Sequence, residues 1–270
     1  MLARLRRQSE LRGLPKELTL RLYFLERFLA RLSNSPYRDR LVLKGGLNLY
    51  SRYQSSARPT RDIDLMGRGL PGSVEAVERA VREIAQVDAG DGVELDLQSL
   101  KARAILEEAR YPGVRVNLNA RFFEAHETLQ LDFSFGGVIT PEPVTLPFPT
   151  LLDEPGFALL GYPLETIVAE KTAAMVELGG GNTRLKDFYD LYWIAQQEQL
   201  DPASLQKAIR RTFTQRGTPL PGSLATLQGL LTPQAQEAWE LFIRRTRLGA
   251  EPDFAKVLQA ILGLVGESLE

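Results

Sequence analysis

Two carboxylates stand two residues apart in the segment RDIDLM, residues 61–66. Its alternation of charged and apolar residues is typical of a half-buried strand, so Asp62 and Asp64 leave the same face. Paired carboxylates on one face can bind a hard cation such as Mg²⁺, which prefers oxygen ligands. An ordinary solvated strand face has the same pattern, so the surrounding segments must distinguish the two interpretations.

The composition excludes several other chemistries. None of the 270 residues is a cysteine, so a disulfide, a thiolate zinc site and a thiol nucleophile are all excluded. The single histidine, His126 in the polar stretch EAHET, cannot form a three-histidine zinc site or an HExxH motif. Any catalysis must therefore be carried by carboxylates, lysines and a hard cation.

A glycine pair, Gly45-Gly46, lies between a short apolar strand at residues 41–44 and a helix predicted from Leu47 to Tyr53. Backbone N–H groups at such a strand-to-helix turn can bind phosphate, because the positive end of the helix faces the ligand. A glycine pair is also common in simple turns. The order of strand, glycine pair, helix, loop and Asp-x-Asp strand is much rarer than either part alone.

A site for nucleotidyl transfer commonly needs a third carboxylate on a neighbouring strand, partly to accept a proton from the attacking hydroxyl. Asp132 is the best candidate, because it is the only charged residue in the apolar strand LQLDFSF. Asp96 in ELDLQ is the alternative, but it alternates with Glu94 and is typical of an exposed face.

The C-terminal half contributes a second polar group. Lys171 lies mid-helix among apolar residues and could neutralise a triphosphate. Asp187 and Asp190 lie one turn apart on the next predicted helix, where Asp187 could equally be an N-terminal charge favoured by the helix dipole. The GGGN segment between these helices lacks the GKS of a P-loop, which argues against a P-loop NTPase.

The periodicity predicts an α+β fold with a mixed sheet, followed by an all-helical C-terminal domain. The Pro- and Gly-rich stretch 140–161 is the best boundary, and the domains are expected to span residues 1–155 and 156–270. Strands are predicted at residues 41–44, 61–66, 94–100, 114–118, 129–135 and 144–148. Helices are predicted at residues 18–32, 47–53, 73–87, 164–178, 186–197, 202–213, 233–248 and 253–269.

Charge is unevenly distributed along the chain. Residues 1–70 contain 15 basic and 6 acidic side chains, although the net charge of the whole chain is −1. The first quarter could bind a polyanion such as RNA, or its arginines could cover solvated helix faces. No apolar run is long enough for a signal peptide or a membrane span, and together with the missing cysteines this favours a cytoplasmic protein.

Five segments resemble the AbiEii-type nucleotidyltransferase toxins of type IV toxin–antitoxin systems, which belong to the DNA polymerase β-like superfamily. The resemblance covers about residues 10–200, and its motifs fall in family order. The segments are LVLKGGLNLY, RPTRDIDLMG, LQLDFSF, EKTAAM and RLKDFYDLYWI. Together, the KGG, RxTxDIDL and KDFYDL motifs are specific, whereas any one of them is not.

The resemblance implies a role for each matched residue. Asp62 and Asp64 match the metal-binding pair, and Asp132 matches the third acidic position. Gly45 and Gly46 match the turn that holds the triphosphate; Lys44 and Arg61 belong to the same two motifs and are assigned to nucleotide binding. Lys171 and Asp187 match the lysine of the third motif and the aspartate of the fourth. The chain departs from the family at Leu47, where Ser or Thr is common.

The implied activity is Mg²⁺-dependent transfer of NMP from an NTP to the 3′ end of tRNA, with a cognate antitoxin encoded nearby and no membrane partner. In that reaction the helical C-terminal domain completes the active site. Two alternatives remain open. The acceptor could be a hydroxyl of a protein or a small molecule, or the chain could be a non-catalytic module that binds RNA or a partner on the same fold.

Overall fold

The computed structural model describes residues 2–107, 111–152, 154–179, 183–221, 227, 229–246 and 248–269. Most of the GGGN segment, residues 180–182, therefore lies outside the described residues. The chain divides into two compact units. Unit 1 comprises Met1–Gly137 and Val144–Gly161, and unit 2 comprises Val138–Pro143 and Tyr162–Glu270.

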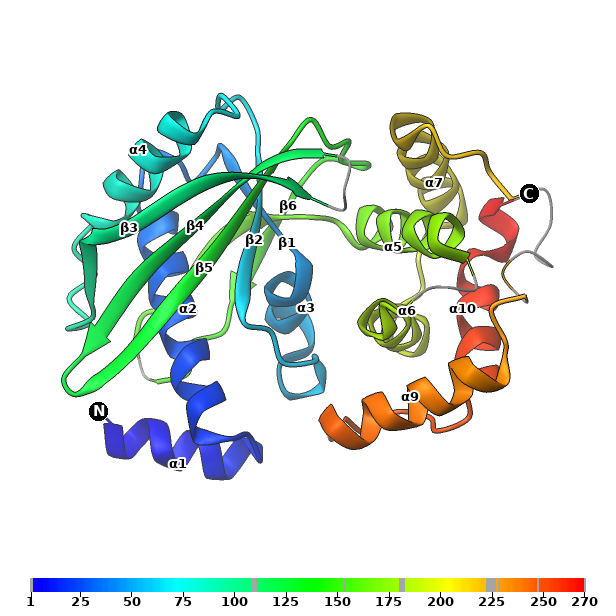
Figure 1. Ribbon diagram of the computed structural model, residues 1–270, viewed down its shortest axis with the longest axis horizontal. Coiled ribbons are helices and arrows are strands. Elements are labelled where there is room, and N and C mark those ends of the chain that lie inside the picture. The colour runs from blue at the N-terminus through cyan, green and yellow to red at the C-terminus, as the bar shows by residue number, and fades with distance from the viewer. Residues whose placement is uncertain are drawn as a thin grey trace. The chain divides into compact units, whose positions relative to one another are not determined.

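Unit 1 contains helices and one mixed sheet (Figure 1). Its helices are α1 (Leu2–Arg12), α2 (Lys16–Ser33), α3 (Gly45–Tyr53) and α4 (Val74–Ala85). Its strands are β1 (Leu41–Lys44), β2 (Asp62–Gly67), β3 (Glu94–Glu107), β4 (Tyr111–Phe122), β5 (Ala125–Phe135), β6 (Val144–Phe148) and β7 (Phe157–Gly161). The order across the sheet is β3-β4-β5-β2-β1-β7-β6. The pairs β2–β5 and β1–β7 are parallel, and the other neighbouring strands are antiparallel.

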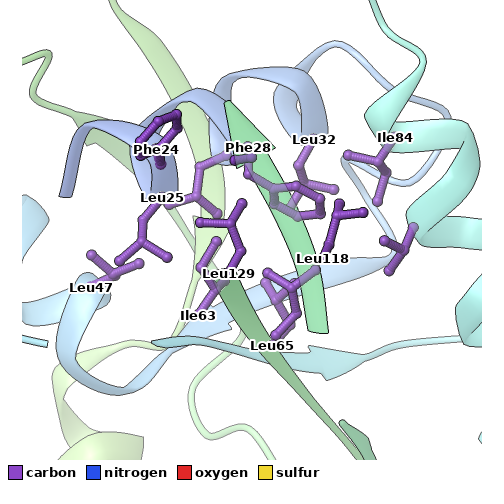
Figure 2. Packing of buried hydrophobic residues seen from close by; sticks show 14 of the residues in the cluster. Phe24, Leu25, Phe28, Leu32, Leu47, Ile63, Leu65, Ile84, Leu118 and Leu129 are labelled. Atoms are coloured by element: carbon purple, nitrogen blue, oxygen red, sulfur yellow. The ribbon is translucent and has the colours of Figure 1, made fainter. Parts of the chain in front are cut away.

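Apolar side chains on one face of the sheet pack against α2 and α4. Figure 2 shows Phe28 of α2, Ile84 of α4 and Leu65 of β2 in this core. Ile63 and Leu65 of β2 point into this core, as do the core residues of β5 beside them. Because successive residues of a strand point to opposite faces, the residues that alternate with these core residues point to the other face of the sheet. The packing of this core therefore determines which face presents the aspartates.

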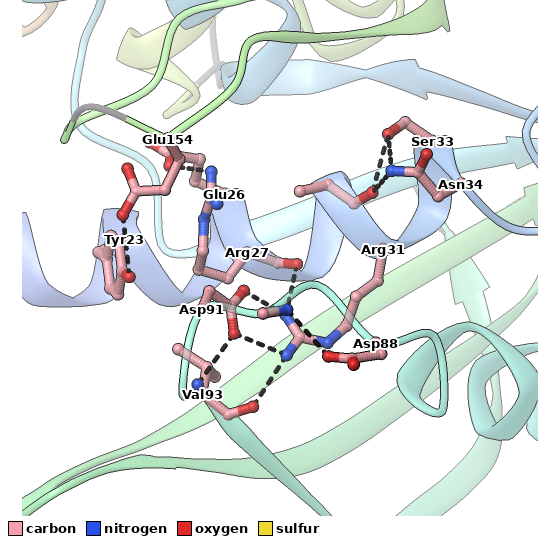
Figure 3. Close-up of polar contacts among 12 residues, drawn as sticks. Tyr23, Glu26, Arg27, Arg31, Ser33, Asn34, Asp88, Asp91, Val93 and Glu154 are labelled. Carbon is pink, nitrogen blue, oxygen red and sulfur yellow. Dashed lines mark hydrogen bonds and ion pairs between the residues drawn. The ribbon is translucent and has the colours of Figure 1, made fainter.

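Helix α2 also buries three charged side chains, Glu26, Arg27 and Arg31, which the leucine stripe alone did not predict (Figure 3). Arg31 donates two hydrogen bonds to Asp91, at 2.7 and 2.8 Å. Glu26 pairs with Arg27 and accepts a hydrogen bond from the N–H of Leu151 at 2.7 Å. Burial raises the pKa of Glu26 to about 7. Part of the basic first quarter is therefore internal to the fold.

Most predicted elements are confirmed, with differences at α1, β7 and the strand lengths. Helix α1 buries only Leu5 and Ser9 of its described side chains, so it has little apolar periodicity to reveal it. Strand β3 continues to Glu107 through the residues KARAILE, whose composition suits a helix. Its pairing with β4 outweighs this local preference, because the ladder satisfies the backbone of both strands.

Every regular element described in unit 2 is a helix, as predicted. The helices are α5 (Leu164–Leu178), α6 (Leu185–Gln197), α7 (Pro202–Arg216), α9 (Pro233–Thr246) and α10 (Phe254–Leu269). The ring of Phe254 packs against those of Phe188 and Trp239, with centroids 5.1 and 5.8 Å apart. No described helix is both long enough and apolar enough to cross a membrane.

Candidate active site

Three aspartates meet on the face of the sheet opposite the core that packs against α2 and α4. Asp64 of β2 lies directly opposite Asp132 of β5, and Asp62 precedes Asp64 on the same face of β2. One carboxylate oxygen from each lies within 4.8 Å of the others. Asp62 and Asp64 are half-buried and Asp132 is buried. The parallel pairing of β2 with β5 thus brings together acids that are 68 or more residues apart along the chain.

The glycine pair approaches these acids closely. Strand β1 ends at Lys44, which is paired with Asp64, and α3 begins at Gly45. Gly45 has φ +64°, and a Cβ at this position would lie 2.0 Å from Oδ2 of Asp64. Only glycine combines this backbone conformation with so close an approach. The helix N-terminus and its positive dipole therefore lie beside the carboxylates.

Thr60 connects the second glycine to the first aspartate. A Cβ on Gly46 would lie 2.7 Å from Cβ of Thr60. The hydroxyl of Thr60 donates a hydrogen bond to Oδ1 of Asp62 at 2.8 Å, which orients that carboxylate. Leu47, where the family commonly has Ser or Thr, is 1 % exposed and packs in the core (Figure 2). Its position therefore contributes apolar packing rather than a hydroxyl to the site.

Arg115 is a site residue that the sequence interpretation missed. It lies on β4 opposite Asp132 and donates to both of its oxygens, with Nε–Oδ1 and Nη2–Oδ2 distances of 2.7 Å. Gln130 donates to Oδ2 of Asp132 at 3.2 Å. The hydrogen bond to Asp132 raises the pKa of Arg115, against the effect of burial, and the charges of Asp132, Asp62 and Asp64 raise it further.

The alternating segment VRVNLN contained a signal for Arg115, because its polar residues share one face of a strand. The sequence did not show that this face would register against Asp132. Asp96, the alternative third acid, is on β3 and lies opposite Asn119 of β4. It is not part of the cluster of three aspartates. The structure therefore groups Asp132, rather than Asp96, with Asp62 and Asp64.

The donor set fits a hard divalent cation. Three carboxylates and one guanidinium carry formal charges of −3 and +1, so these four groups sum to −2. Oxygen ligands from carboxylates suit Mg²⁺, whereas softer metals prefer histidine or cysteine, and neither residue occurs in this cluster. An ionised carboxylate has about four lone-pair sites, so Asp132 can accept the bonds from Arg115 and still contact a ligand.

Lys171 and Asp187 meet in unit 2. Nζ of Lys171 lies 2.6 Å from Oδ1 of Asp187 and 2.8 Å from Oδ2 of Asp190, and Nε of Arg184 lies 2.6 Å from Oδ2 of Asp187. Both aspartates are buried. Burial alone would raise the pKa of Asp187, but Lys171 and Arg184 outweigh it and the pKa lies below its ordinary value. This cluster has a clear structural role.

Replacing Asp187 by Asn should lower the free energy of unfolding by about 3 kcal/mol, because Lys171 and Arg184 lose a buried counter-charge. Because the pKa of Asp187 is lowered in the fold, its stabilising contribution is present above the unfolded-state value near 4 and is lost at lower pH. Urea unfolding monitored by tryptophan fluorescence measures the loss, since both tryptophans, Trp193 and Trp239, lie in unit 2.

The matched control for that experiment is Glu237→Gln on the exposed surface of α9, which should change stability by less than about 0.5 kcal/mol. Equal stability of the Asp187 and Glu237 variants would contradict the proposed contribution of the buried cluster.

The chain is similar to one family of known proteins and, in its fold, to two solved structures. The family described as "Nucleotidyl transferase AbiEii toxin, Type IV TA system" matches residues 27–260. A crystal structure of a candidate nucleotidyltransferase from Helicobacter pylori superposes with TM-score 0.54 at 13 % identity, covering 94 % of each chain. JHP933 from Helicobacter pylori superposes with TM-score 0.55 at 14 % identity, covering 94 % of this chain and 91 % of the other. No curated protein sequence matches significantly.

The two solved structures support the fold alone, and the predicted nucleotidyltransferase fold with a mixed sheet and a helical second part is confirmed. The family match covers most of the chain and includes all three clustered aspartates, the glycine pair and the Lys171 cluster. The chain therefore belongs to the AbiEii family of nucleotidyltransferase toxins of type IV toxin–antitoxin systems.

Proposed function

We propose that this protein is a Mg²⁺-dependent toxin that transfers NMP from an NTP to the 3′ end of tRNA. The observation that carries the proposal is the cluster of Asp62, Asp64 and Asp132 beside the start of α3 at Gly45. Oxygen ligands and a helix N-terminus in one place suit a divalent cation with a bound phosphate chain.

Asp62 and Asp64 would hold Mg²⁺ in this proposal, with Asp132 as the third ligand. When bound, the ion would neutralise charge on the phosphates and polarise the α-phosphoryl group. Gly45 and Gly46 would offer backbone N–H groups to the triphosphate. Lys44 and Arg61 would add positive charge beside it, Lys44 from the end of β1 and Arg61 from the residue before β2.

The reaction forms one bond and breaks another. The acceptor 3′-hydroxyl oxygen attacks the α-phosphorus, a new P–O bond forms, and the bond between the α-phosphorus and the bridging oxygen breaks. Pyrophosphate leaves with the electron pair. Asp132 would take the hydroxyl proton, while Arg115 keeps that carboxylate oriented through its two hydrogen bonds.

Lys171 and Asp187 are the remaining residues assigned to transfer. Lys171 would offset negative charge on the leaving pyrophosphate. Asp187 would act as a positioning residue, because its carboxylate accepts a 2.6 Å hydrogen bond from the Lys171 ammonium group. The proposed partners are an NTP, a tRNA or another RNA, and a cognate antitoxin in the cytoplasm.

A labelling experiment tests the proposed reaction. Purified protein is incubated with each α-³²P-labelled NTP, Mg²⁺ and total tRNA, and the products are digested separately with ribonuclease and with protease. We expect label that ribonuclease removes and protease does not. Transfer should disappear with EDTA and with tRNA whose terminal diol has been oxidised by periodate, because the attacking hydroxyl is then absent.

The same experiment separates the alternatives. Label that survives ribonuclease but not protease would assign a protein acceptor. A labelled product that is neither RNA nor protein and differs from the NTP on thin-layer chromatography would assign a small molecule. A protein that transfers no label with any NTP would refute the enzymatic proposal. Calorimetry of NTP binding with and without Mg²⁺ would then distinguish an inactive nucleotide-binding fold from a module that binds no nucleotide.

A further inference from the structure

The face of the sheet that carries the aspartates continues over two more strands. Asp132 of β5 lies opposite Arg115 of β4, and Arg115 lies opposite Arg103 of β3. Two residues along the strands, Asn117 of β4 lies opposite Lys101 of β3. Two adjacent rows of registered residues therefore lead from the acid cluster to β3. Figure 1 shows β3, β4 and β5 as neighbouring strands of the sheet, with β3 at its edge.

The charges on these rows are unusual for a sheet. Arg103 and Arg115 are like charges directly opposite each other, an arrangement that destabilises an antiparallel pair. Arg115 is neutralised by its two bonds to Asp132, whereas Arg103 and Lys101 are exposed and have no ion-pair partner among the described residues. Of the acids farther along β3 on this face, Glu94 pairs with Arg121 at 2.5 Å, and Asp96 accepts a hydrogen bond from the backbone N–H of Gln98 at 3.0 Å. An anion bound over this face would supply the counter-charge that Arg103 and Lys101 lack.

Two amide side chains lie between Lys101 of β3 and Asp62 of β2 in the register of the sheet. Asn117 of β4 lies opposite Gln130 of β5 on this face, and both are half-buried. Amides can donate to phosphate oxygens and to sugar hydroxyls. The rows lack the large apolar side chains that form the centre of a protein–protein interface, so their chemistry suits a nucleic-acid backbone better than a protein surface.

We propose that Lys101 and Arg103 bind backbone phosphates of the acceptor RNA close to its 3′ end. This inference rests on the proposed function and adds the surface that receives the acceptor. Two inter-strand spacings separate Arg103 from Asp132, which is about 10 Å, and Lys101 lies about 7 Å from Arg103 along β3. The two cations thus lie within reach of the last nucleotides when the terminal hydroxyl is at Asp132.

The test compares two double variants that remove the same charge. K101Q/R103Q alters the proposed surface, and R38Q/R79Q removes two exposed arginines, of which Arg79 lies on α4, against the opposite face of the sheet. Binding of a fluorescein-labelled single-stranded RNA with a free 3′-hydroxyl is measured by anisotropy between 50 and 300 mM NaCl, roughly the range over which counterion release is resolved. Thermal melting and circular dichroism establish that each variant is folded.

We expect K101Q/R103Q to bind the RNA about tenfold more weakly than wild type at about 100 mM salt. The slope of log K against log salt should fall by about 1.4, since each phosphate contact on a single strand contributes about 0.7. R38Q/R79Q should match wild type within about twofold. Equal affinities and slopes for the two double variants, or a wild-type protein that binds no RNA, would overturn the inference.

Failure of the proposed enzymatic function is measured separately in the same proteins. Calorimetry of Mg²⁺-dependent NTP binding should give equal affinities for wild type and K101Q/R103Q, because neither side chain belongs to the proposed nucleotide site. If the wild-type protein does not bind NTP, the enzymatic proposal is refuted. The RNA titration still tests separately whether Lys101 and Arg103 bind RNA. If label is transferred to protein and K101Q/R103Q binds RNA as tightly as wild type, both the tRNA acceptor and the RNA-binding role of Lys101 and Arg103 are rejected.

Discussion

Replacing Asp64 by Asn should lower the rate of NMP transfer at least about 1,000-fold, which corresponds to about 4 kcal/mol of transition-state stabilisation. Asn has nearly the size of Asp but lacks the negative charge that a divalent cation requires. Asp64 lies between Asp132 on β5 and Lys44 on β1, at the centre of the site. Initial rates with labelled NTP and tRNA at saturating Mg²⁺ measure the change.

Two further measurements make this prediction specific. Asp96→Asn removes the same charge from β3, outside the aspartate cluster, and should leave the transfer rate within about twofold of wild type. Electron paramagnetic resonance of added Mn²⁺ should show binding at least about tenfold weaker in D64N than in D96N. Full transfer by D64N would reject the assignment of the site, whatever the acceptor.

Gly45→Ala should lower transfer at least about 100-fold, because the new methyl group would displace the carboxylate of Asp64. The methyl carbon would lie 2.0 Å from Oδ2 and 2.8 Å from Cγ of Asp64, so the carboxylate must move. The left-handed conformation of residue 45 adds about 1 kcal/mol of backbone strain for alanine. Transfer rates and Mn²⁺ binding, measured as for D64N, should both fall.

Gly69→Ala provides the matched control. Gly69 has φ +68°, nearly that of Gly45, but a Cβ there would meet no atom within 4 Å. G69A should therefore lose about the same stability as G45A from backbone strain and keep wild-type transfer. Equal transfer by G45A and G69A would show that the approach of Gly45 to Asp64 is irrelevant to the reaction.

The local patterns of the sequence determined most of the elements. Period-3.6 and period-2 arrangements of apolar residues predicted α2, α4 and the central strands, because burial of one face requires that periodicity. They also determined that Asp62 and Asp64 share a face, since side chains alternate along a strand. The motifs KGG, RxTxDIDL and KDFYDL led to the family that the comparison then established.

Tertiary structure alone decided which distant residues meet. The register of β2 against β5 places Asp132 opposite Asp64, and the register of β4 places Arg115 opposite Asp132. These pairings depend on strand order and on the packing of the sheet against α2 and α4. A shift of one residue would turn every side chain to the other face. Such long-range geometry leaves no local pattern in one sequence, and for this reason Arg115 and the basic row on β3 emerged only from the folded chain.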